Sequence, residues 1–395
     1  MPFSAIICAT KPAGEAAGML RSGLSFAGQT LVEYQARQAA EAGAGHVMIV
    51  VGAVTQALSR AVDRLTADGI SVALIRDMVS LIREAPRSAD VLLVADGLIV
   101  PQRYYTQMGN ESGNALLVVE ENAATTNLER LNAHSRWAGI ARFAPELLFN
   151  TLDMIGDWDL ELTLVRAAVQ SGYKPVHANI EDVMEGRLAL VNRQADADLV
   201  TEALLARPAT PTGEAGAERY LLGPLANLLA PALLRAQVPA GQARMAAFAV
   251  GALGLITAFL AWPIIALILC LAGIALSLTA DNLAALARRG GQDIWASLGV
   301  QAIVIAALAL VAVNADRMLD GLYLILSLAM SALALRAMGR TARWTWAMMT
   351  PGSACCVILV AALAGYVQAG FVAVICVAIL SLGMALLAVA DIEKR

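Results

Sequence analysis

The fold of the first half of the chain is decided by AIICATKPAGEAAGMLRSGLSFAGQTLVEYQARQAAEAG at residues 5–43, followed by HVMIVVG at residues 46–52. The apolar run from Phe3 to Ala9 predicts a buried strand. Leu31 to Ala42 has the apolar spacing of a helix, and residues 46–52 predict a second strand. A strand, a helix and a strand in this order are typical of a parallel sheet covered by helices.

The same alternation continues to about residue 207. Short apolar runs predict further strands at Ser71–Ile75, Val91–Val94, Leu116–Val119 and near Val176, and Leu160–Ser171 predicts a helix. We therefore expect residues 1–207 to form a three-layer α/β domain of Rossmann-like type.

The second half of the chain is much more apolar than the first. The 395 residues are 58% hydrophobic and 15% charged, and the mean hydropathy is +0.65, so part of the chain is expected to face lipid. Charges are spread over residues 1–220, but from Ala246 onward they occur in short clusters. Residues 208–218, PATPTGEAGAE, have the composition of a linker, which leaves residues 219–395 as a membrane domain.

Six stretches approach the roughly 20 apolar residues that a membrane-spanning helix needs. They form three pairs, at Met245–Ala261 and Ile264–Ala280, at Ala296–Val313 and Leu319–Leu335, and at Trp346–Val367 and Gly370–Ala390. Tyr220–Leu234 is amphipathic and is expected along the membrane surface. The sequence thus predicts an all-α bundle of about six transmembrane helices. Gly251, Gly254, Gly273, Ala332 and Gly383 predict close helix packing, in a tight bundle or a homodimer.

The charges between these stretches predict how the bundle is oriented. Lys and Arg accumulate on the cytoplasmic side of a membrane. The N-terminus has no signal-peptide pattern, so the first domain is expected in the cytoplasm. The outer loops would then hold only Arg317, and the inner ones Arg288, Arg289, Arg336, Arg340, Arg343, Lys394 and Arg395. We expect a multi-pass protein of a bacterial-type inner membrane, with the N-terminal domain and the C-terminus in the cytoplasm.

Charge and cysteine content exclude some classes of function. The net charge of −4 and the lack of a basic run argue against nucleic-acid binding. The five cysteines have no metal-type spacing and are expected to be small buried hydrophobic residues.

Residues 5–52 resemble the start of the nucleotidyltransferase family that makes nucleotide sugars and related NDP-alcohols. In that family a Gly-rich loop after the first strand wraps the triphosphate, and an Asp at the end of a later strand holds Mg²⁺. The resemblance implies binding of CTP or another NTP by Thr10, Lys11, Gly14 and Arg21. It also implies that Asp96, in VLLVADG, is the catalytic and metal-binding carboxylate. GIARFAPELLF at residues 139–149 is similar to a later segment of the family.

The chain departs from this family's pattern in the loop. The usual AAGxGxR sequence is replaced by Ala9–Gly14 and a stretch ending near Arg21, and the lysine expected before Gly28 is missing. Taken alone, Lys11 and Arg21 are typical of solvated loop charges, and Asp96 before Gly97 is also typical of a turn. Both interpretations stay open at this point.

The membrane half resembles the CDP-alcohol phosphatidyltransferases, which include forms fused to a nucleotidyltransferase. Their pattern DxxDGxxAR…GxxxDxxxD supplies four carboxylates to two divalent metals. The corresponding stretch here is LSLTADNLAALARRGGQDIWASLGVQAIVIAA at residues 276–307. In either register at least three of the four ligands are missing, and Asp281 is the one candidate metal ligand, although its place at a predicted span end is also typical of interfacial exposure. Phosphatidyl transfer by this bundle is therefore not expected.

Together these patterns predict a membrane-anchored protein that is related to enzymes of phospholipid-headgroup or envelope glycan synthesis. Because ligand residues of both halves are lost, we expect degenerate active sites and a role as partner or regulator of other membrane proteins. The alternative is an active nucleotidyltransferase in which Lys11, Arg21 and Asp96 form a variant site and transfer a nucleotidyl group to a sugar- or polyol-phosphate. A transporter is disfavoured because the spans lack charges at mid-depth.

Overall fold

The structure is a computed structural model that describes residues 3–14, 19–154, 159–206, 218–236, 238, 240–287, 294–338 and 349–393. The chain divides into two compact units, with Met1–Leu204 in the first and most of the chain from Leu205 onward in the second. The predicted linker at residues 208–218 lies outside the described residues except for Glu218.

The N-terminal unit is built on a mixed sheet in which β1 is a central strand. The strand order is β11 (Lys174–His177), β8 (Ala115–Glu120), β10 (Ser135–Phe143), β6 (Val91–Val94), β1 (Phe3–Ala9), β4 (Ala44–Val51) and β5 (Val72–Ile75), and β9 (Glu129–Arg130) pairs with β10. β10 is antiparallel to its neighbours β6 and β8, while β1 is parallel to both β4 and β6. Two separate two-stranded antiparallel sheets pair β2 (Ser25–Phe26) with β3 (Gln29–Thr30), and β7 (Leu98–Ile99) with β12 (Ala189–Leu190).

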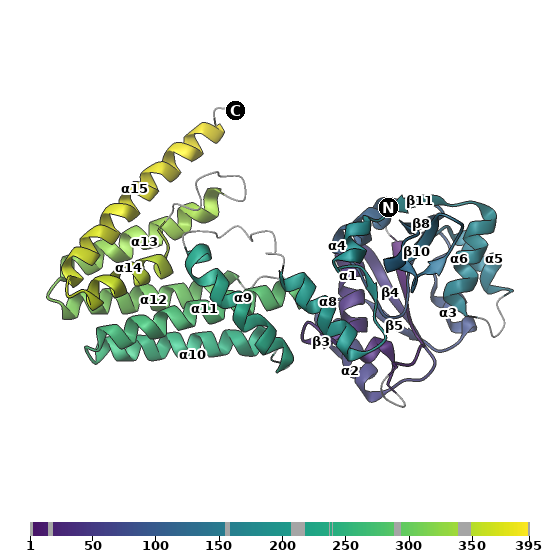
Figure 1. Ribbon diagram of the computed structural model, residues 1–395, viewed down its shortest axis with the longest axis horizontal. Helices are drawn as coiled ribbons and strands as arrows, with labels where there is room; N and C mark the ends of the chain where they lie inside the picture. The colour runs from purple at the N-terminus through teal and green to yellow at the C-terminus, as the bar shows by residue number, and fades with distance from the viewer. Residues whose placement is uncertain are drawn as a thin grey trace. The chain divides into compact units, whose positions relative to one another are not determined.

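Helices cover both faces of this sheet, as the sequence predicted. They are α1 (Leu31–Glu41), α2 (Gln56–Ala67), α3 (Met78–Glu84), α4 (Gln102–Asn110), α5 (Pro145–Leu152), α6 (Leu160–Ser171), α7 (Ile180–Met184) and α8 (Gln194–Ala206). Figure 1 shows α1 and α4 on one side of the sheet and α3, α5 and α6 on the other. The expected three-layer α/β architecture is confirmed.

Local sequence explains how the first strand and helix form. All seven residues of β1 are buried, and full burial of an aliphatic side chain such as Ile6 or Ile7 contributes roughly 1.5–3 kcal/mol. Thr30 and Glu33 form a capping box at the start of α1. The fully buried Glu33 also accepts two hydrogen bonds from Arg64, at 2.8 and 2.7 Å, which fix α2 against α1.

The nine-residue strand β10 was not predicted from the sequence. It contains Arg142, a residue type that is almost never fully buried unless it is paired. In the structure Arg142 is 1% exposed, its Nε donates to Asp90 Oδ2 at 3.0 Å, and its Nη1 donates to the Gly109 carbonyl at 2.5 Å. These partners compensate the buried charge, and they lie far from Arg142 in the sequence.

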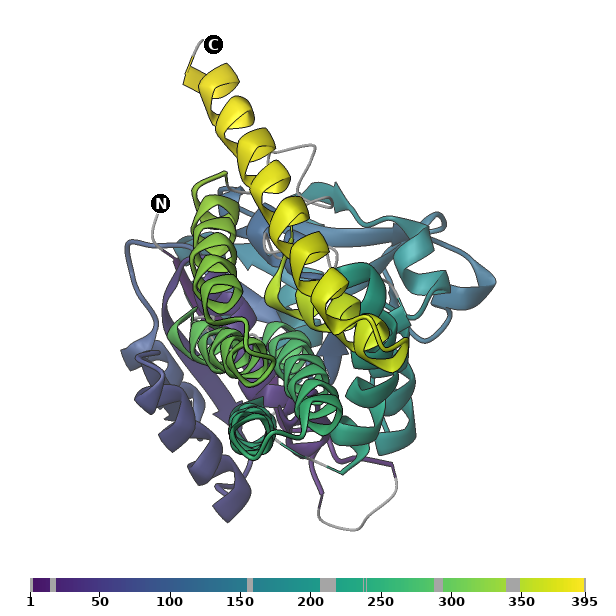
Figure 2. The same ribbon diagram turned by 90° about the vertical axis from the view of Figure 1, so that its left-hand side faces the viewer.

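The C-terminal unit is helical. Its helices are α9 (Glu218–Arg235), α10 (Ala240–Phe259), α11 (Pro263–Ala287), α12 (Ile294–Asn314), α13 (Met318–Met338), α14 (Pro351–Leu363) and α15 (Val367–Glu393). In Figures 1 and 2, α15, in yellow, is tilted against the other long helices. Within the described residues, Ala240–Phe259 and Pro263–Ala284 are long and apolar enough to cross a membrane, whereas the remaining apolar segments are shorter.

The expected span Trp346–Val367 differs most from the structure. Trp346 lies outside the described residues, and α14 has only 13 residues. Thr350 and Ser353 form a capping box at its start, and the positive φ of Gly365 follows its end. Thirteen residues rise about 20 Å, which is less than the roughly 30 Å hydrocarbon core.

Glycines allow α10 and α11 to approach closely, as predicted. A Cβ on Gly254 would lie 2.9 Å from Cys270 Sγ, and one on Gly273 would lie 3.2 Å from the Gly251 nitrogen. The connection between these two helices is the predicted turn before Pro263. The expectation that every cysteine is buried is wrong for Cys376, which is exposed, and Cys356 is only partly buried.

Candidate functional site

The carboxyl ends of β1 and β6 bring Lys11 and Asp96 together. Because the two strands are adjacent and parallel, the residues that follow them lie at one edge of the sheet. The Lys11 backbone N–H donates to Asp96 Oδ2 at 2.6 Å. The structure therefore places the predicted lysine beside the predicted carboxylate.

The Lys11 side chain is paired with acids of the chain itself. Lys11 Nζ donates to Glu161 Oε2 at 2.6 Å and lies 3.5 Å from Asp159 Oδ2. Glu161 is buried, and its Oε1 accepts from the Asp96 backbone N–H at 2.8 Å. Glu161 thus connects the side chain of Lys11 to the backbone of Asp96.

Asp159 and Glu161 were not predicted as site residues. Asp159 caps α6 and accepts hydrogen bonds from the backbone N–H groups of Glu161 and Leu162. Acids at a helix start are usual because they complement the positive end of the helix. Nothing in this local pattern indicates that Glu161 reaches a lysine 150 residues away.

Burial controls the charge of Asp96. The residue is 1% exposed, and its Oδ1 has no hydrogen-bond partner among the residues that the structure describes. Burial raises the pKa of Asp96 to about 7, because the backbone N–H of Lys11 offsets only part of the desolvation and Glu161 adds repulsion. Near neutral pH the carboxyl is therefore partly protonated.

Lys11 and Cys8, two titratable neighbours of Asp96, are held in protonation states that are not nucleophilic. Burial disfavours the charged form of Lys11, but the carboxylates of Glu161 and Asp159 outweigh it and raise the lysine pKa above its ordinary value. Burial, then Glu161 and Asp96, raise the pKa of the Cys8 thiol. Lys11 stays cationic and Cys8 stays a neutral thiol, which removes both as nucleophiles.

The described backbone N–H groups that follow Thr10 in the loop after β1 already have acceptors. Lys11 donates to Asp96, Ala13 donates to the Met19 carbonyl at 2.7 Å, and Gly14 donates to the Asn192 carbonyl at 2.9 Å. Pro12 has no N–H. Across residues 11–14 no backbone donor is left for a phosphate, although a phosphate-binding loop works through such donors.

Arg21 lies at the base of the same loop. Its backbone N–H donates to the Lys11 carbonyl at 3.0 Å, and its side chain packs against Gly97, next to Asp96. Arg21 Nε is buried without a hydrogen-bond partner in the described part of the chain. Gly97 has a φ of +81°, and a Cβ there would lie 2.6 Å from the Val191 carbonyl oxygen, so only glycine fits.

The two predicted metal ligands, Asp96 and Asp281, lie in different units of the chain. Mg²⁺ needs several oxygen ligands in octahedral geometry. No group of three or more His, Cys, Asp and Glu within the described ranges is placed to hold a metal. Asp281, on α11 in the other unit, accepts a hydrogen bond from Arg244 Nη2 at 3.0 Å. Metal binding by Asp96 or Asp281 remains a prediction.

Comparisons with known proteins concern the N-terminal half. No family model and no curated protein match the sequence. Among solved structures, the chain is similar to a nucleotidyl transferase from Methanothermobacter thermautotroptrophicus (15% identity, 52% of this chain and 99% of that chain, TM-score 0.38). It is also similar to 4-diphosphocytidyl-2C-methyl-D-erythritol synthase (14%, 51% and 98%, TM-score 0.36) and to the inositol-1-phosphate CTP transferase from T. maritima (12%, 51% and 95%, TM-score 0.37). Each likeness covers about half of this chain and concerns the fold alone.

Proposed function

We propose that the N-terminal unit is a nucleotidyltransferase-like module that does not transfer nucleotides, and that the protein serves as a partner or regulator of membrane enzymes. Phospholipid-headgroup or envelope glycan synthesis is the setting that the family resemblances imply. The observation that carries the proposal is the 2.6 Å ion pair between Lys11 Nζ and Glu161 Oε2. In this pair the ammonium group of Lys11 is bound to Glu161, and it is not available to bind the phosphates of CTP or another NTP.

Binding a triphosphate at this site is opposed by charge. The phosphates would have to displace Glu161 from Lys11, and they would then face the carboxylates of both Glu161 and Asp159. A buried charge that loses its partner costs roughly 3–5 kcal/mol. The occupied N–H groups of residues 11–14 offer no compensating contacts.

A second candidate function is an active nucleotidyltransferase with a variant site. It is favoured by two buried polar atoms without hydrogen-bond partners in the described residues, Asp96 Oδ1 and Arg21 Nε. A ligand that reached both atoms would satisfy them. Under this alternative, Mg²⁺ would be held by Asp96 and the acceptor would be a sugar- or polyol-phosphate.

Pyrophosphate release distinguishes the two functions. The full chain in lipid nanodiscs would be mixed with each NTP, Mg²⁺ or Mn²⁺, and a panel of sugar- and polyol-phosphates. We expect no release above that of Asp96→Asn, because the Lys11 side chain and the N–H donors of residues 11–14 are engaged. Metal-dependent release that Asp96→Asn abolishes would contradict the first proposal and establish the second.

We propose further that the C-terminal unit is embedded in a bacterial-type inner membrane, with both ends of the chain in the cytoplasm. Two observations support this placement. Two helices have sufficient length and apolarity, and large apolar side chains such as Leu253, Ile256, Leu326 and Leu380 are more than half exposed. Such surfaces are costly in water and favourable in lipid. Of the charges behind the proposed orientation, Arg288, Arg289, Arg340, Arg343, Lys394 and Arg395 lie outside the described residues.

Alkaline extraction tests the membrane placement. After washing of membranes at about pH 11, the full chain is expected to stay in the pellet, because embedding by apolar surface does not depend on charge. Protease added to the outer side of the membrane should leave the N-terminal unit intact. Release of the chain into the wash would contradict this proposal without affecting that for the nucleotide site.

A further inference from the structure

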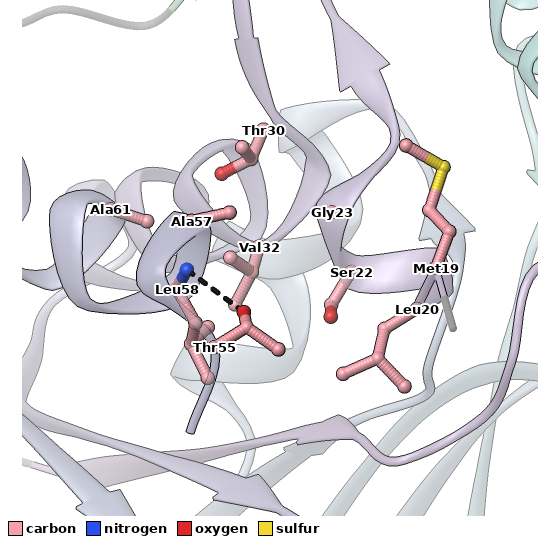
Figure 3. Close-up of a pocket in the computed structure, with 10 residues that line it drawn as sticks. All are labelled: Met19, Leu20, Ser22, Gly23, Thr30, Val32, Thr55, Ala57, Leu58 and Ala61. Carbon is pink, nitrogen blue, oxygen red and sulfur yellow. Dashed lines mark hydrogen bonds between the residues drawn. The ribbon is translucent and has the colours of Figure 1, made fainter. Parts of the chain in front are cut away.

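The N-terminal unit contains an apolar pocket that the proposed function does not use. Its volume is about 360 Å³, within the roughly 300–1,000 Å³ that small-molecule sites occupy. The pocket lies between the segment Met19–Gly23, the start of α1 and the first turns of α2, as Figure 3 shows. Its apolar wall includes Leu20, Val32, Leu58 and Ala61.

Among the described residues that line the pocket, one hydroxyl group is free. None of these residues is charged, and their other two hydroxyl groups are engaged: Thr30 Oγ1 donates to Glu33 at 2.7 Å, and Thr55 Oγ1 accepts from the Leu58 N–H at 3.2 Å. Ser22 is 2% exposed and makes no side-chain hydrogen bond with any described residue. In Figure 3 its oxygen points toward the space between Leu20 and Thr55.

The start of α2 supplies further donors to this space. The helix has 12 residues, and Thr55 caps only the Leu58 N–H. The N–H groups of Gln56 and Ala57 have no acceptor within the helix, and the N-terminus of a helix carries partial positive charge. An acceptor oxygen between Ser22 and α2 would therefore be well bound, while the apolar wall would bind hydrocarbon.

We propose that this pocket binds a neutral, largely apolar molecule whose hydroxyl or carbonyl oxygen contacts Ser22 and the start of α2. A full negative charge is disfavoured because the described lining residues offer no cation and a buried unpaired charge is expensive. Ser22 follows Arg21 in the short helix η1 (Arg21–Gly23), so a bound molecule would also hold the segment that carries Arg21. The proposal concerns a different site from the nucleotide loop and does not depend on its inactivity.

Three matched probes test the pocket, namely benzyl alcohol, benzoate and toluene. The readout is the methyl NMR signal of Met19 in methionine-labelled full chain in nanodiscs, assigned with Met19→Leu. We expect a saturable shift with benzyl alcohol and at least about tenfold weaker binding of benzoate. Ser22→Ala should weaken benzyl alcohol roughly 3- to 10-fold through the lost hydrogen bond and leave toluene unchanged.

Two tryptophan variants on α2 provide a steric control. Ala57 lines the pocket and is exposed, so Ala57→Trp should fill the space and abolish the Met19 shift. Ser59 is exposed on the same helix but outside the lining, so Ser59→Trp should bind benzyl alcohol like the wild type. No saturable shift, equal binding of benzoate and benzyl alcohol, or no effect of both Ser22→Ala and Ala57→Trp would overturn the proposal.

The source of the ligand is tested separately. In a second arm, 1-dodecanol is supplied within the nanodisc lipid. A Met19 shift in this arm supports the site with a membrane-derived ligand, and a shift with aqueous benzyl alcohol alone supports it with a water-soluble one.

Discussion

Asp96→Asn is expected to stabilise the N-terminal unit by about 1–3 kcal/mol at pH 8 and to destabilise it by about 1–3 kcal/mol near pH 4, where Asp96 is protonated and only the cost of the buried amide donor remains. Burial raises the pKa of Asp96 to about 7, from an ordinary value of 3.8. Between these two values the folded state holds a proton that the unfolded state has lost. The contribution of Asp96 to stability is therefore complete below pH 3.8 and is lost as the pH rises through 7.

The size of this effect follows from the two pKa values. Each pKa unit corresponds to about 1.4 kcal/mol, so ionised Asp96 costs about 4 kcal/mol at pH 8. Asparagine is neutral and can still accept the Lys11 N–H, but its amide nitrogen would replace the unpartnered Oδ1. An unsatisfied buried donor costs roughly 1–3 kcal/mol. When this cost is subtracted from the gain of about 4 kcal/mol, the expected net stabilisation at pH 8 is about 1–3 kcal/mol.

Hydrogen exchange of the β1 and β6 amides in the full chain, at pH 4, 6 and 8, measures this stability locally. Asp63→Asn is the matched control, because Asp63 is exposed on α2 and should show no such gain. A loss of protection in Asp96→Asn at pH 8 would mean that the native site holds an ionised, well-paired carboxylate.

Lys11→Met is expected to destabilise the N-terminal unit by about 2–3 kcal/mol at neutral pH. The substitution leaves Glu161, whose side chain is 4% exposed, without its cation. The expected loss is below the roughly 3–5 kcal/mol of a fully buried pair because the Lys11 side chain is 30% exposed and partly screened. Adding Glu161→Gln should restore more than half of the loss, since the amide oxygen can still accept from the Asp96 N–H.

The double-mutant cycle of Lys11→Met and Glu161→Gln measures the pair by the same exchange experiment. Lys174→Met is the control, because Lys174 also forms a 2.6 Å ion pair, with Glu111, but its side chain is 63% exposed. That pair is expected to contribute less than about 1 kcal/mol. Equal losses of stability in Lys11→Met and Lys174→Met would show that the ion pair at Lys11 stabilises the N-terminal unit no more than an exposed pair does.

Apolar runs predicted much of the sheet, since β1 and β6 begin and end where the sequence placed them. Runs of this kind are typical of strands buried on both faces. β10 was missed because its buried Arg142 is compensated by Asp90 and by carbonyls of α4, and such distant pairing leaves no local signal. In the helical unit the helices lie close to the segments that the sequence predicted. α14 is shorter than its predicted segment because Thr350 caps its start and Gly365, with a positive φ, follows its end.

The candidate site at Lys11 and Asp96 was predicted only in part. The family resemblance grouped Lys11 and Asp96 in one site, and the structure brings them together because β1 and β6 are neighbouring parallel strands. Their partners could not be predicted. Glu161 had the local pattern of a helix start, and the acceptor of the Gly14 N–H is the carbonyl of Asn192, far along the chain. These partners decide whether the loop is free to bind phosphate.

Calorimetric titration of the full chain in nanodiscs with CTP and the other NTPs, in Mg²⁺ or Mn²⁺, is the first test of whether the nucleotide loop is closed to triphosphates. Wild type and Asp96→Asn would be compared in the same buffer. We expect no metal-dependent binding to either protein, because the Lys11 side chain and the N–H groups of residues 11–14 are occupied by the chain itself. Metal-dependent binding to the wild type that Asp96→Asn removes would contradict this expectation and identify a working nucleotide site.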